Sequence, residues 1–511
     1  MSLVYDLGAM VHKGKESVTI EHHVLTWLAH QEQPSYLVGG CVRDRVLGRP
    51  ARDLDLVVAQ GGLALARRLA NRFGGAYFAM DEERGTGRAI LAAGGEDLVV
   101  DVAEFRGADL AADLEARDFT INALAASVQS PDTVIDLHNG LEDLHGRILR
   151  PVTEASIRDD PLRALRAVRL AADLNFDLAP ETERLIRRDG GALPQVSAER
   201  VRDEMARMLA HPRSASQLFC LDDLNLLGLV FPELEALRGL VQPAPHVHEA
   251  LPHSLQAVHG LDELLAALAE MEEVGDCRVR LEPLAPFARR ILDHVGQSLG
   301  EVRPRLVALK LAALLHDTGK PMTRTVDDAG RIRFLDHPEA GVQIAGDALR
   351  RLRFNRLEVR LTTTVIRHHM RPLLLAAQEQ VSKRAVYRLF RDVDDAGVDV
   401  LLHALADHRA TYGLQAPDTG WRDLVGLVAR MLGDLWERGP ERVHPPSLVS
   451  GHDLMREFGL GPGPQIGRLL EAVREAQVSG EVNSRGEALA LIRRYLAQST
   501  TAESESGLTS H

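Results

Sequence analysis

Two aspartates in the N-terminal third, Asp53 and Asp55, are separated by one leucine, which is a spacing suited to a metal-binding pair. Because side chains alternate along a β-strand, both carboxylates point to the same side if this segment is a strand. Neighbouring carboxylates repel each other unless a cation neutralises them, and Mg²⁺ held by carboxylates and substrate phosphates is the usual solution. Two such ions about 4 Å apart can activate an attacking hydroxyl and stabilise a leaving pyrophosphate. The alternative is a solvated strand edge, since Asp-x-Asp is a common sequence.

A pair of glycines precedes the two aspartates. Residues 35–38 are typical of a strand that ends at Gly39 and Gly40, where a helix begins. Paired glycines let the backbone approach a phosphate closely, and amides at the helix start can donate hydrogen bonds to it. Arg43 can add charge-assisted bonds. A glycine pair alone is more often an ordinary turn, so this prediction depends on the nearby aspartates.

A third carboxylate, Asp101, interrupts the apolar strand that the sequence predicts over 98–105. A buried strand seldom carries an unpaired carboxylate. We therefore predict Asp101 as the third carboxylate of the metal site. Glu104 would face the opposite side of a regular strand and ranks lower.

Histidines and aspartates of the types found in metal sites recur in the C-terminal half. His316 and Asp317 end an apolar helical segment, and further candidates lie far from them in the chain. Imidazoles and carboxylates that converge from several helices can bind divalent metals. The full set resembles the HD phosphohydrolase domain. The resemblance implies ligands for a divalent transition metal at His253, His316, Asp317 and Asp407, and a second metal position completed by His337 and His368. The alternative is a vestigial site that holds the helical domain together.

The elements that must position these residues change in type along the chain. Strands are predicted at 35–38, 54–58, 87–93 and 98–105, with a helix at 62–73 between them. From about residue 160 onward the pattern is almost wholly helical, with short Pro and Gly breaks. The sequence therefore predicts an α+β chain: a small head with a mixed β-sheet, followed by an extended all-α body.

Composition sets the broad class. The chain has 511 residues, a formal net charge of −13, 45% hydrophobic and 26% charged residues, which is typical of a soluble globular protein. We find no apolar stretch of about 18 residues that would span a bilayer, and no basic and apolar regions of a signal peptide. Three widely spaced cysteines favour a reducing compartment over a disulfide framework. The sequence therefore predicts a cytoplasmic protein without a membrane partner.

The acidic net charge does not exclude a nucleic-acid partner, because clustered arginines locate a binding surface better than global charge does. Arg163, Arg166 and Arg169 recur at every third position of one predicted helix. Seven further arginines follow at Arg184, Arg187, Arg188, Arg200, Arg202, Arg207 and Arg213. This cluster suits the backbone of an RNA duplex. The alternative is that these arginines pair with nearby carboxylates, among them Asp159, Glu181, Glu183, Asp189, Glu199 and Glu204.

Four motifs, in this order and spacing, resemble those of class II tRNA nucleotidyltransferases and bacterial poly(A) polymerases. They are Gly-Gly-Cys-Val-Arg-Asp at 39–44 with 47–49 and 53–55, Arg-Asp-Phe-Thr-Ile-Asn-Ala-Leu-Ala at 117–125, and the segments 136–144 and 159–169. The resemblance runs from about residue 35 to 240. Further matches cover most of the remainder, including residues 450–467, which resemble the C-terminal helical region of members that carry an HD domain.

The resemblance implies a role for each matching residue. Asp53 and Asp55 would bind catalytic Mg²⁺, with Asp101 assisting. The nucleotide triphosphate would be held by Gly39, Gly40 and Arg43. The sugar and phosphates would be positioned by Arg117, Asp118 and Asn122. The incoming base would be read by Asp160 and Arg163, and Arg166 and Arg169 would complete the nucleotide-binding set.

The chemistry of Asp160 and Arg163 suits the reading of a base. Residues i and i+3 share a helix face. A carboxylate accepts from an exocyclic amine, and an arginine donates to a ring nitrogen or carbonyl. CTP and ATP both carry such an amine, whereas UTP and GTP present the wrong pattern on that edge. The alternative is an ordinary ion pair on the helix surface.

The sequence departs from the family pattern at three places. Ala116 stands where relatives usually have a first arginine, and Asp159 stands where a glutamate usually precedes Asp160. Only residues 107–112 connect Arg106 to Asp113, where many relatives have a much longer flexible loop. In the family that loop helps to switch specificity from CTP to ATP. The short connection therefore predicts a CC-adding subtype, and the alternative is a compact loop with full CCA-adding activity.

The sequence thus predicts an enzyme that adds CMP, and in a full CCA-adding enzyme also AMP, to tRNA 3′ ends with release of pyrophosphate. The expected domains are a helical lead-in at 1–30, the nucleotidyltransferase head at 31–150, an RNA-binding neck at 151–240, the HD domain at 245–415, a helical tRNA-binding region at 416–496 and a disordered tail at 497–511. Alternatives are a poly(A) polymerase, an HD phosphohydrolase as the main activity, and a tRNA-binding module without activity.

Overall fold

A computed structural model describes residues 3–6, 20–50, 53–92, 97–274, 281–300, 303–413, 418–437, 443 and 445–506. Contacts divide the chain into two compact units. Unit 1 comprises Met1–Met205 and Cys220–Val230, and unit 2 comprises Ala206–Phe219 and Phe231–His511. The boundary passes through the segment expected to be one neck domain.

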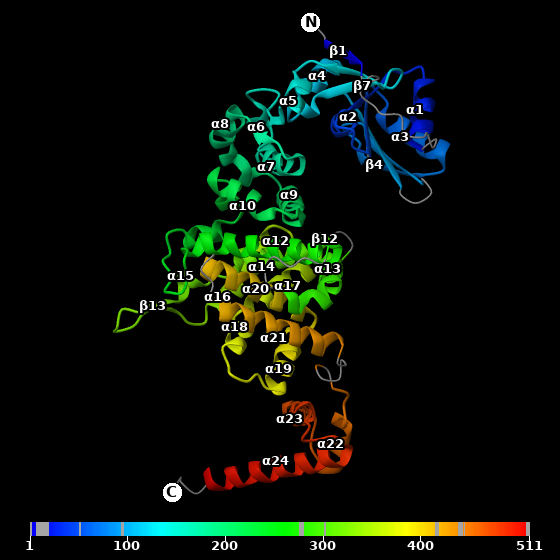
Figure 1. Cartoon of the computed structure of the whole chain (residues 1–511). Helices are drawn as coiled ribbons and strands as arrows, with labels where there is room; N and C mark the ends of the chain where they lie inside the picture. The colour runs from blue at the N-terminus through cyan, green and yellow to red at the C-terminus, as the bar shows by residue number, and fades with distance from the viewer. Residues whose placement is uncertain are drawn as a thin grey trace. The chain divides into compact units, whose positions relative to one another are not determined.

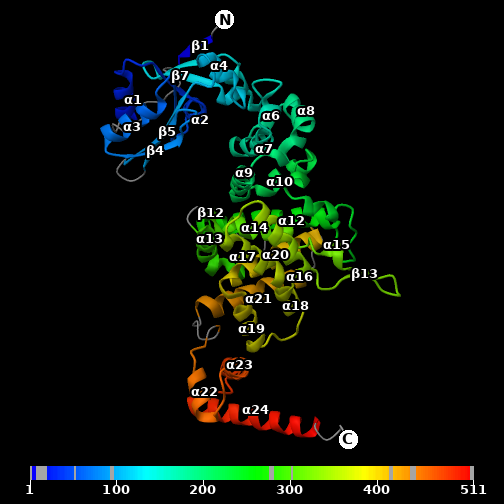
Figure 2. The same ribbon diagram turned by 180° about the vertical axis from the view of Figure 1, so that it is seen from behind.

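Unit 1 is built on an eight-stranded mixed sheet in the order β1-β8-β7-β2-β3-β6-β5-β4 (Figures 1 and 2). β3 and β6 run parallel, and the other neighbouring strands run antiparallel. The strands are β1 (Leu3–Asp6), β2 (Ser35–Val38), β3 (Asp53–Val58), β4 (Ala76–Asp81), β5 (Thr86–Leu91), β6 (Leu98–Glu104), β7 (Leu124–Ser127) and β8 (Thr133–Asp136). The predicted mixed-sheet head is confirmed.

One face of strands β4, β5 and β6 packs against α3 (Gly62–Phe73). Alternate residues of β5 and β6, among them Ala89, Leu91, Val100 and Val102, are fully buried. The residues between them belong to the other face and are only half-buried. This alternation is why polar residues inside these apolar strands all reach the same side of the sheet.

Further helices of unit 1 lie between and after the strands of the sheet. They are α1 (Ile20–Ala29), α2 (Gly40–Val46), α4 (Leu110–Glu115), α5 (Gly140–Gly146), α6 (Ser156–Asp159), α7 (Leu162–Leu174), α8 (Pro180–Asp189), α9 (Ala198–Ala210), which continues into unit 2, and α11 (Leu227–Val230). On α7 the apolar residues are buried while Arg163, Arg166 and Arg169 are half-buried on the other side.

Unit 2 is almost wholly helical. Its helices include α12 (Ala250–Val274), α14 (Arg305–Leu315), α16 (His337–Arg351), α17 (Arg356–His368), α18 (Met370–Ala376), α19 (Lys383–Val393), α20 (Gly397–Tyr412) and α21 (Asp418–Trp436). α14 is apolar almost all round and lies buried among α12, α17 and α20. The helices α22 (Gly451–Phe458), α23 (Pro464–Ser479) and α24 (Arg485–Ser506) have their own apolar core. The predicted helical body is confirmed.

Three segments differ from the sequence-based expectation. The lead-in contains β1, which pairs with β8, in addition to a helix. A two-stranded hairpin, β13 (Arg324–Val326) and β14 (Ile332–Phe334), interrupts the helical body. α24 continues to Ser506 through the expected disordered tail, because no glycine or proline stops it before Gly507; residues 507–511 lie outside the described part. None of the described helices combines the length and apolar character needed to cross a bilayer.

Candidate active site and metal centre

The two aspartates of the first motif lie on β3, beside the third predicted carboxylate. Asp55 is directly opposite Asp101 on the parallel strand β6. Asp53 is exposed at the start of β3, whereas Asp55 is half-buried. The spacing argument therefore correctly predicted three carboxylates on one face of the sheet.

An arginine that the sequence analysis missed neutralises one of these carboxylates. Arg88 on β5 donates from Nε and Nη2 to the two oxygens of Asp101, at 2.7 and 2.8 Å. Burial and the neighbouring Asp101 raise the pKa of Asp55, whereas Arg117 and Arg88 oppose this shift. The pair Asp53 and Asp55 is thus left short of positive charge, which is the situation a divalent cation corrects.

Gly39 and the second motif meet at the same end of the sheet. Gly39 has φ +75°, and a Cβ there would lie 2.9 Å from Nη1 of Arg117, so the close approach of this guanidinium requires glycine. Arg117 donates to Oδ2 of the buried Asp113 at 2.8 and 3.1 Å. Asp113 also accepts from the backbone N–H of Arg106. Asp113, also missed in the sequence, fixes the orientation of Arg117.

A chain of hydrogen bonds joins the first motif to α7. Arg43 donates to Oδ1 of Asn122 at 2.7 Å, and Asn122 donates to Oδ1 of Asp118 at 3.0 Å. Asp118 in turn accepts two bonds from Arg166, at 2.8 and 3.1 Å. Burial alone would raise the pKa of Asp118, but Arg166 and Asn122 outweigh it and lower that pKa. Four residues predicted separately therefore act as one network.

The expected base-reading pair does not form an ion pair with itself. Arg163 donates to the carbonyl of Ala116 at 2.7 Å and to those of Arg117 and Ser156 at 3.2 Å. Asp160 instead accepts from Arg200 at 2.7 Å. The alternative of an Asp160–Arg163 surface ion pair is therefore wrong.

Most arginines of the predicted RNA-facing cluster in unit 1 are ion-paired within the chain. Arg166 and Arg169 share the buried Glu204, and Arg184 and Arg188 share Glu154. Their charge is therefore partly neutralised, as the alternative interpretation predicted. A cavity of about 1440 Å³ lies within unit 1, lined among others by Gly39, Gly40, Arg43, Asp55, Asp101, Arg117, Asp118, Asn122, Asp160, Arg163, Arg166 and Arg169.

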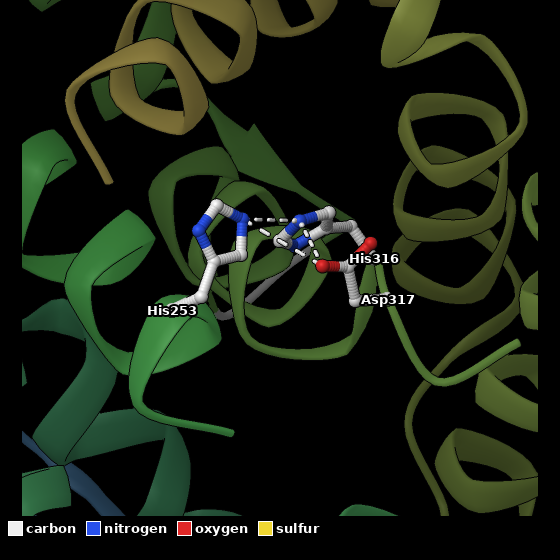
Figure 3. Close-up of side chains that lie close together, drawn as sticks. All are labelled: His253, His316 and Asp317. Atoms are coloured by element: carbon white, nitrogen blue, oxygen red, sulfur yellow. Dashed lines mark hydrogen bonds and ion pairs between the residues drawn. The ribbon is translucent and has the colours of Figure 1, made fainter. Parts of the chain in front are cut away.

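In unit 2, α12, the end of α14, the start of α16 and α20 bring five of the predicted histidines and aspartates together, and Figure 3 shows three of them, His253, His316 and Asp317. Nε2 of His253 on α12 lies 3.3 Å from Nε2 of His316 and 3.0 Å from Oδ1 of Asp407 on α20. Oδ2 of Asp317 lies 3.2 Å from Nε2 of His316. His337 at the start of α16 approaches Oδ1 of Asp317 at 3.6 Å. All five side chains are buried.

The sixth member of the cluster is His369, and not His368. Nε2 of His369 lies 3.3 Å from Nε2 of His337, and His369 belongs to two of the three groups of potential ligands among the described residues. His368 ends α17, is half-buried and belongs to none of these groups. Two adjacent histidines in a helix point in different directions, and the sequence alone could not say which one faces inward.

The orientation of the rings fits a metal. Nδ1 of His316, His337 and His369 each lies 2.7–2.9 Å from a backbone carbonyl, which can only accept. Nδ1 therefore carries the proton, and in each neutral ring the Nε2 lone pair faces the cluster. Two such lone pairs face each other at 3.3 Å between His337 and His369. Oδ1 of Asp317 is buried without a hydrogen-bond partner. A divalent cation resolves both features.

Neighbouring side chains lower the pKa of Asp317, one of the two carboxylates of this cluster. Burial would raise the pKa of Asp317, but His316 and Lys320 hold it well below the ordinary value. Lys320, which the sequence analysis passed over, lies 2.6 Å from Oδ2 of Asp317. Gly319 lies so close to His337 that a Cβ would meet its carbonyl oxygen at 2.1 Å. Only glycine lets the His-Asp turn pack against the start of α16.

Four family models match the chain. They are described as "Poly A polymerase head domain" (residues 35–150), "Probable RNA and SrmB- binding site of polymerase A" (175–237), "HD domain" (284–407) and "tRNA nucleotidyltransferase domain 2" (444–492). His253 lies before the matched part of the HD domain, although its ring is part of the cluster.

Known proteins are similar over nearly the whole chain. The A-adding tRNA nucleotidyltransferase of Deinococcus radiodurans is 33% identical, over 90% of this chain and 95% of the relative. The CC-adding tRNA nucleotidyltransferase of Thermus thermophilus is 34% identical, over 91% and 96%. The solved structure of a Thermotoga maritima CCA-adding enzyme complexed with tRNA has the same fold, with a TM-score of 0.60 at 20% identity over 97% of this chain and 100% of that chain. The chain therefore belongs to the class II family of CCA-adding enzymes and bacterial poly(A) polymerases, as a tRNA nucleotidyltransferase that carries an HD domain.

Proposed function

We propose that this chain adds CMP to the 3′ end of tRNA and adds AMP poorly, as a CC-adding enzyme. The observation that carries this proposal is the connection between β6 and α4, which consists of Phe105 to Asp109. This connection is short, and hydrogen bonds hold it at both ends. Asp109 caps α4 by accepting from the Ala112 N–H at 3.0 Å, and Asp113 accepts from the Arg106 N–H at 3.1 Å. In the family that this chain resembles, a longer loop at this place helps the change from CTP to ATP. The relatives of this chain include both A-adding and CC-adding enzymes, so similarity to relatives does not by itself identify the subtype.

In the proposed reaction the tRNA 3′ hydroxyl attacks the α-phosphate of the nucleotide in line, and pyrophosphate leaves. Asp53 and Asp55 would hold Mg²⁺, since their oxygens are the hard ligands that this ion prefers. Bound there, Mg²⁺ would stabilise the charge that develops on the transferring phosphate. Both oxygens of Asp101 are bonded to Arg88, so we assign Asp101 a supporting role beside the metal ligands.

The remaining site residues bind and orient the nucleotide in this proposal. Arg43 and Arg117 supply charge for the triphosphate beside Gly39, and Asp113 and Asn122 keep the two guanidiniums in place. Asp160 and Arg163 at the start of α7 face the same cavity and would bond the base. Arg163 is held by three backbone carbonyls, which suits a group that must present a fixed pattern.

The test uses purified protein with three tRNAs, ending before CCA, after C and after CC, each with CTP or ATP. We expect rapid addition of two CMP residues to the first tRNA and slow addition of AMP to the third. Efficient completion to CCA would contradict the subtype, and ATP-only tailing of many RNAs would indicate a poly(A) polymerase instead.

A second activity is favoured by the facing Nε2 atoms of His337 and His369 in unit 2. We propose that the HD centre binds a divalent transition metal through His253, His316, Asp317, His337, His369 and Asp407 and hydrolyses a phosphate ester in the adjoining cavity. That cavity has a volume of about 690 Å³ and includes Lys320 in its lining. Release of phosphate from a general phosphomonoester, or of the alcohol from a general phosphodiester, dependent on added Mn²⁺, Co²⁺ or Ni²⁺ and lost in His253→Ala, tests this activity. Metal binding without turnover would indicate a structural centre.

A further inference from the structure

A row of side chains leads across the sheet of unit 1 from the catalytic aspartates to the edge strand β4. Asp55 on β3 is opposite Asp101 on β6, Asp101 is opposite Arg88 on β5, and Arg88 is opposite Phe78 on β4. Directly opposed residues in neighbouring strands project to the same face. β4 is the edge strand of the sheet (Figure 1). The face that carries the carboxylates therefore ends in the aromatic ring of Phe78.

The ring of Phe78 is exposed, whereas Tyr77, its neighbour in the sequence, is half-buried. Phe78 is 49% exposed, and Met80, which lies where the register between β4 and β5 shifts, is 53% exposed. Tyr77 projects to the other face, where the guanidinium of Arg67 lies 4.8 Å from its ring centroid and the ring packs on Gly87. Large apolar side chains exposed together, next to a charged site, are typical of an interaction surface.

The surroundings of Phe78 favour a nucleic-acid strand as the partner. Asp81, Arg84 and Thr86, from the same β4–β5 hairpin, line the cavity that contains Asp55. Arg84 is exposed and Arg88 lies directly between Phe78 and Asp101. An aromatic ring beside arginines, continuous with a site that acts on an RNA end, is the combination with which proteins bind unpaired nucleotides.

We propose that Phe78 is a stacking platform for an unpaired base near the 3′ end of the RNA substrate. This inference rests on the proposed function, because the strand must deliver its 3′ hydroxyl to Asp53 and Asp55. Three strand spacings place the platform about 14 Å from Asp55, which is about four nucleotides of a stacked strand and fewer of an extended one. The platform therefore holds a base upstream of the reacting nucleotide, and stacking holds it whatever its identity.

The test follows the fluorescence of 2-aminopurine, placed in turn at the last four positions of an acceptor-stem RNA that ends after CC, so that unpaired nucleotides lie upstream of its 3′ end. No nucleotide triphosphate is present, so the readout does not depend on nucleotide transfer. We expect quenching by the wild-type protein to be strongest at a position upstream of the terminal nucleotide. Phe78→Ala should remove that quenching and weaken RNA binding about tenfold, whereas Phe78→Trp should retain both. CTP affinity should not change.

Leu137→Ala is the matched control, because Leu137 is 39% exposed beside the same sheet but does not line the cavity. It should leave quenching and affinity unchanged. Equal quenching in wild type and Phe78→Ala at all four positions would overturn the platform. So would a loss of self-association in Phe78→Ala by analytical ultracentrifugation, because a second copy of the chain would then cover β4. If Phe78→Ala loses the quenching but the wild-type protein adds no CMP to tRNA, the stacking role of Phe78 is supported and the proposed function is contradicted.

Discussion

The two sites of this chain hold their carboxylates in opposite environments. In unit 1, Asp53 and Asp55 lie on an open sheet face, and burial together with Asp101 raises the pKa of Asp55. In unit 2, Asp317 and Asp407 are buried, yet neighbouring histidines lower the pKa of both, and Lys320 adds to this effect at Asp317. The head thus keeps negative charge that an incoming cation and triphosphate must neutralise. In the HD centre, Lys320 already lies 2.6 Å from Oδ2 of Asp317 and offsets part of the negative charge. The first arrangement suits a site that assembles with its substrate, and the second suits a metal that stays.

The largest effect should come from removal of an aspartate in the head. Asp55→Ala should reduce CMP incorporation by at least about a thousandfold, because the reaction loses the ligand that positions its cation. Incorporation of labelled CMP into tRNA measures this, and Asp97→Ala, an exposed carboxylate just before β6, is the control. Metal content of the HD centre should remain unchanged. Retained incorporation in Asp55→Ala would show that the open sheet face is not the active site.

The complementary change removes a ligand from the HD centre. His253→Ala should weaken binding of a transition metal by at least about 10-fold to 100-fold, because even the loss of a residue that only hydrogen-bonds a ligand has a cost of that size. The rate of CMP addition should stay within about twofold of wild type. Metal analysis by mass spectrometry and titration calorimetry measure the first effect. His259→Ala, an exposed position on the same helix, should behave like wild type. Full metal content in His253→Ala would refute the cluster as a metal site.

The opposite pKa shifts predict opposite effects on stability. Without metal, Asp407→Asn should destabilise unit 2 by about 3–5 kcal/mol at neutral pH, because it leaves buried histidines without their carboxylate. The pKa of Asp407 is lowered in the folded state, so its stabilising effect is present above the unfolded-state pKa and is lost as pH falls toward the folded-state pKa. Chemical unfolding in chelator from neutral to acidic pH measures this. A difference that does not shrink in acid would contradict the linkage.

The smallest effect should be an increase in stability, caused by Asp55→Asn in the head. Asp55→Asn should raise the unfolding midpoint of the metal-free protein at neutral pH, because a raised pKa means that the folded state binds the proton more tightly and loses stability as pH rises through that range. Asparagine imitates the protonated form. The gain should vanish in acid, where wild-type Asp55 is itself protonated, and calorimetric scans at several pH values would follow it. A lower midpoint in Asp55→Asn would mean that Arg117 and Arg88 outweigh burial and the charge of Asp101.

Predictions that depended on one local element are the ones that the structure confirms. The strand over 53–58 and the strand over 98–104 could be read from apolar alternation, and a period of two placed Asp53 and Asp55 on one face. β4 was missed, because its pattern is mostly exposed and has no buried alternate residues to signal a strand. The exposed Phe78 was missed with it.

Predictions that depended on the partner of a side chain were less successful. The sequence placed Asp160 and Arg163 three residues apart, and an ion pair between them was a reasonable alternative, but their partners come from Arg200 and from backbone carbonyls far along the chain. His368 was preferred to His369 for the same reason. A rotation of one residue about a helix changes what a side chain faces, and only packing against other helices sets that rotation.

The sequence by itself determined the residue types, their spacing within each element and, through the order of the four motifs, the family. Those properties are local, because a strand or helix has a fixed period whatever surrounds it. Tertiary structure alone decided that Arg88 neutralises Asp101, and that His369 completes a cluster gathered from segments more than 150 residues apart, as His253 and Asp407 show. Those contacts join positions whose separation in sequence carries no information about distance in space.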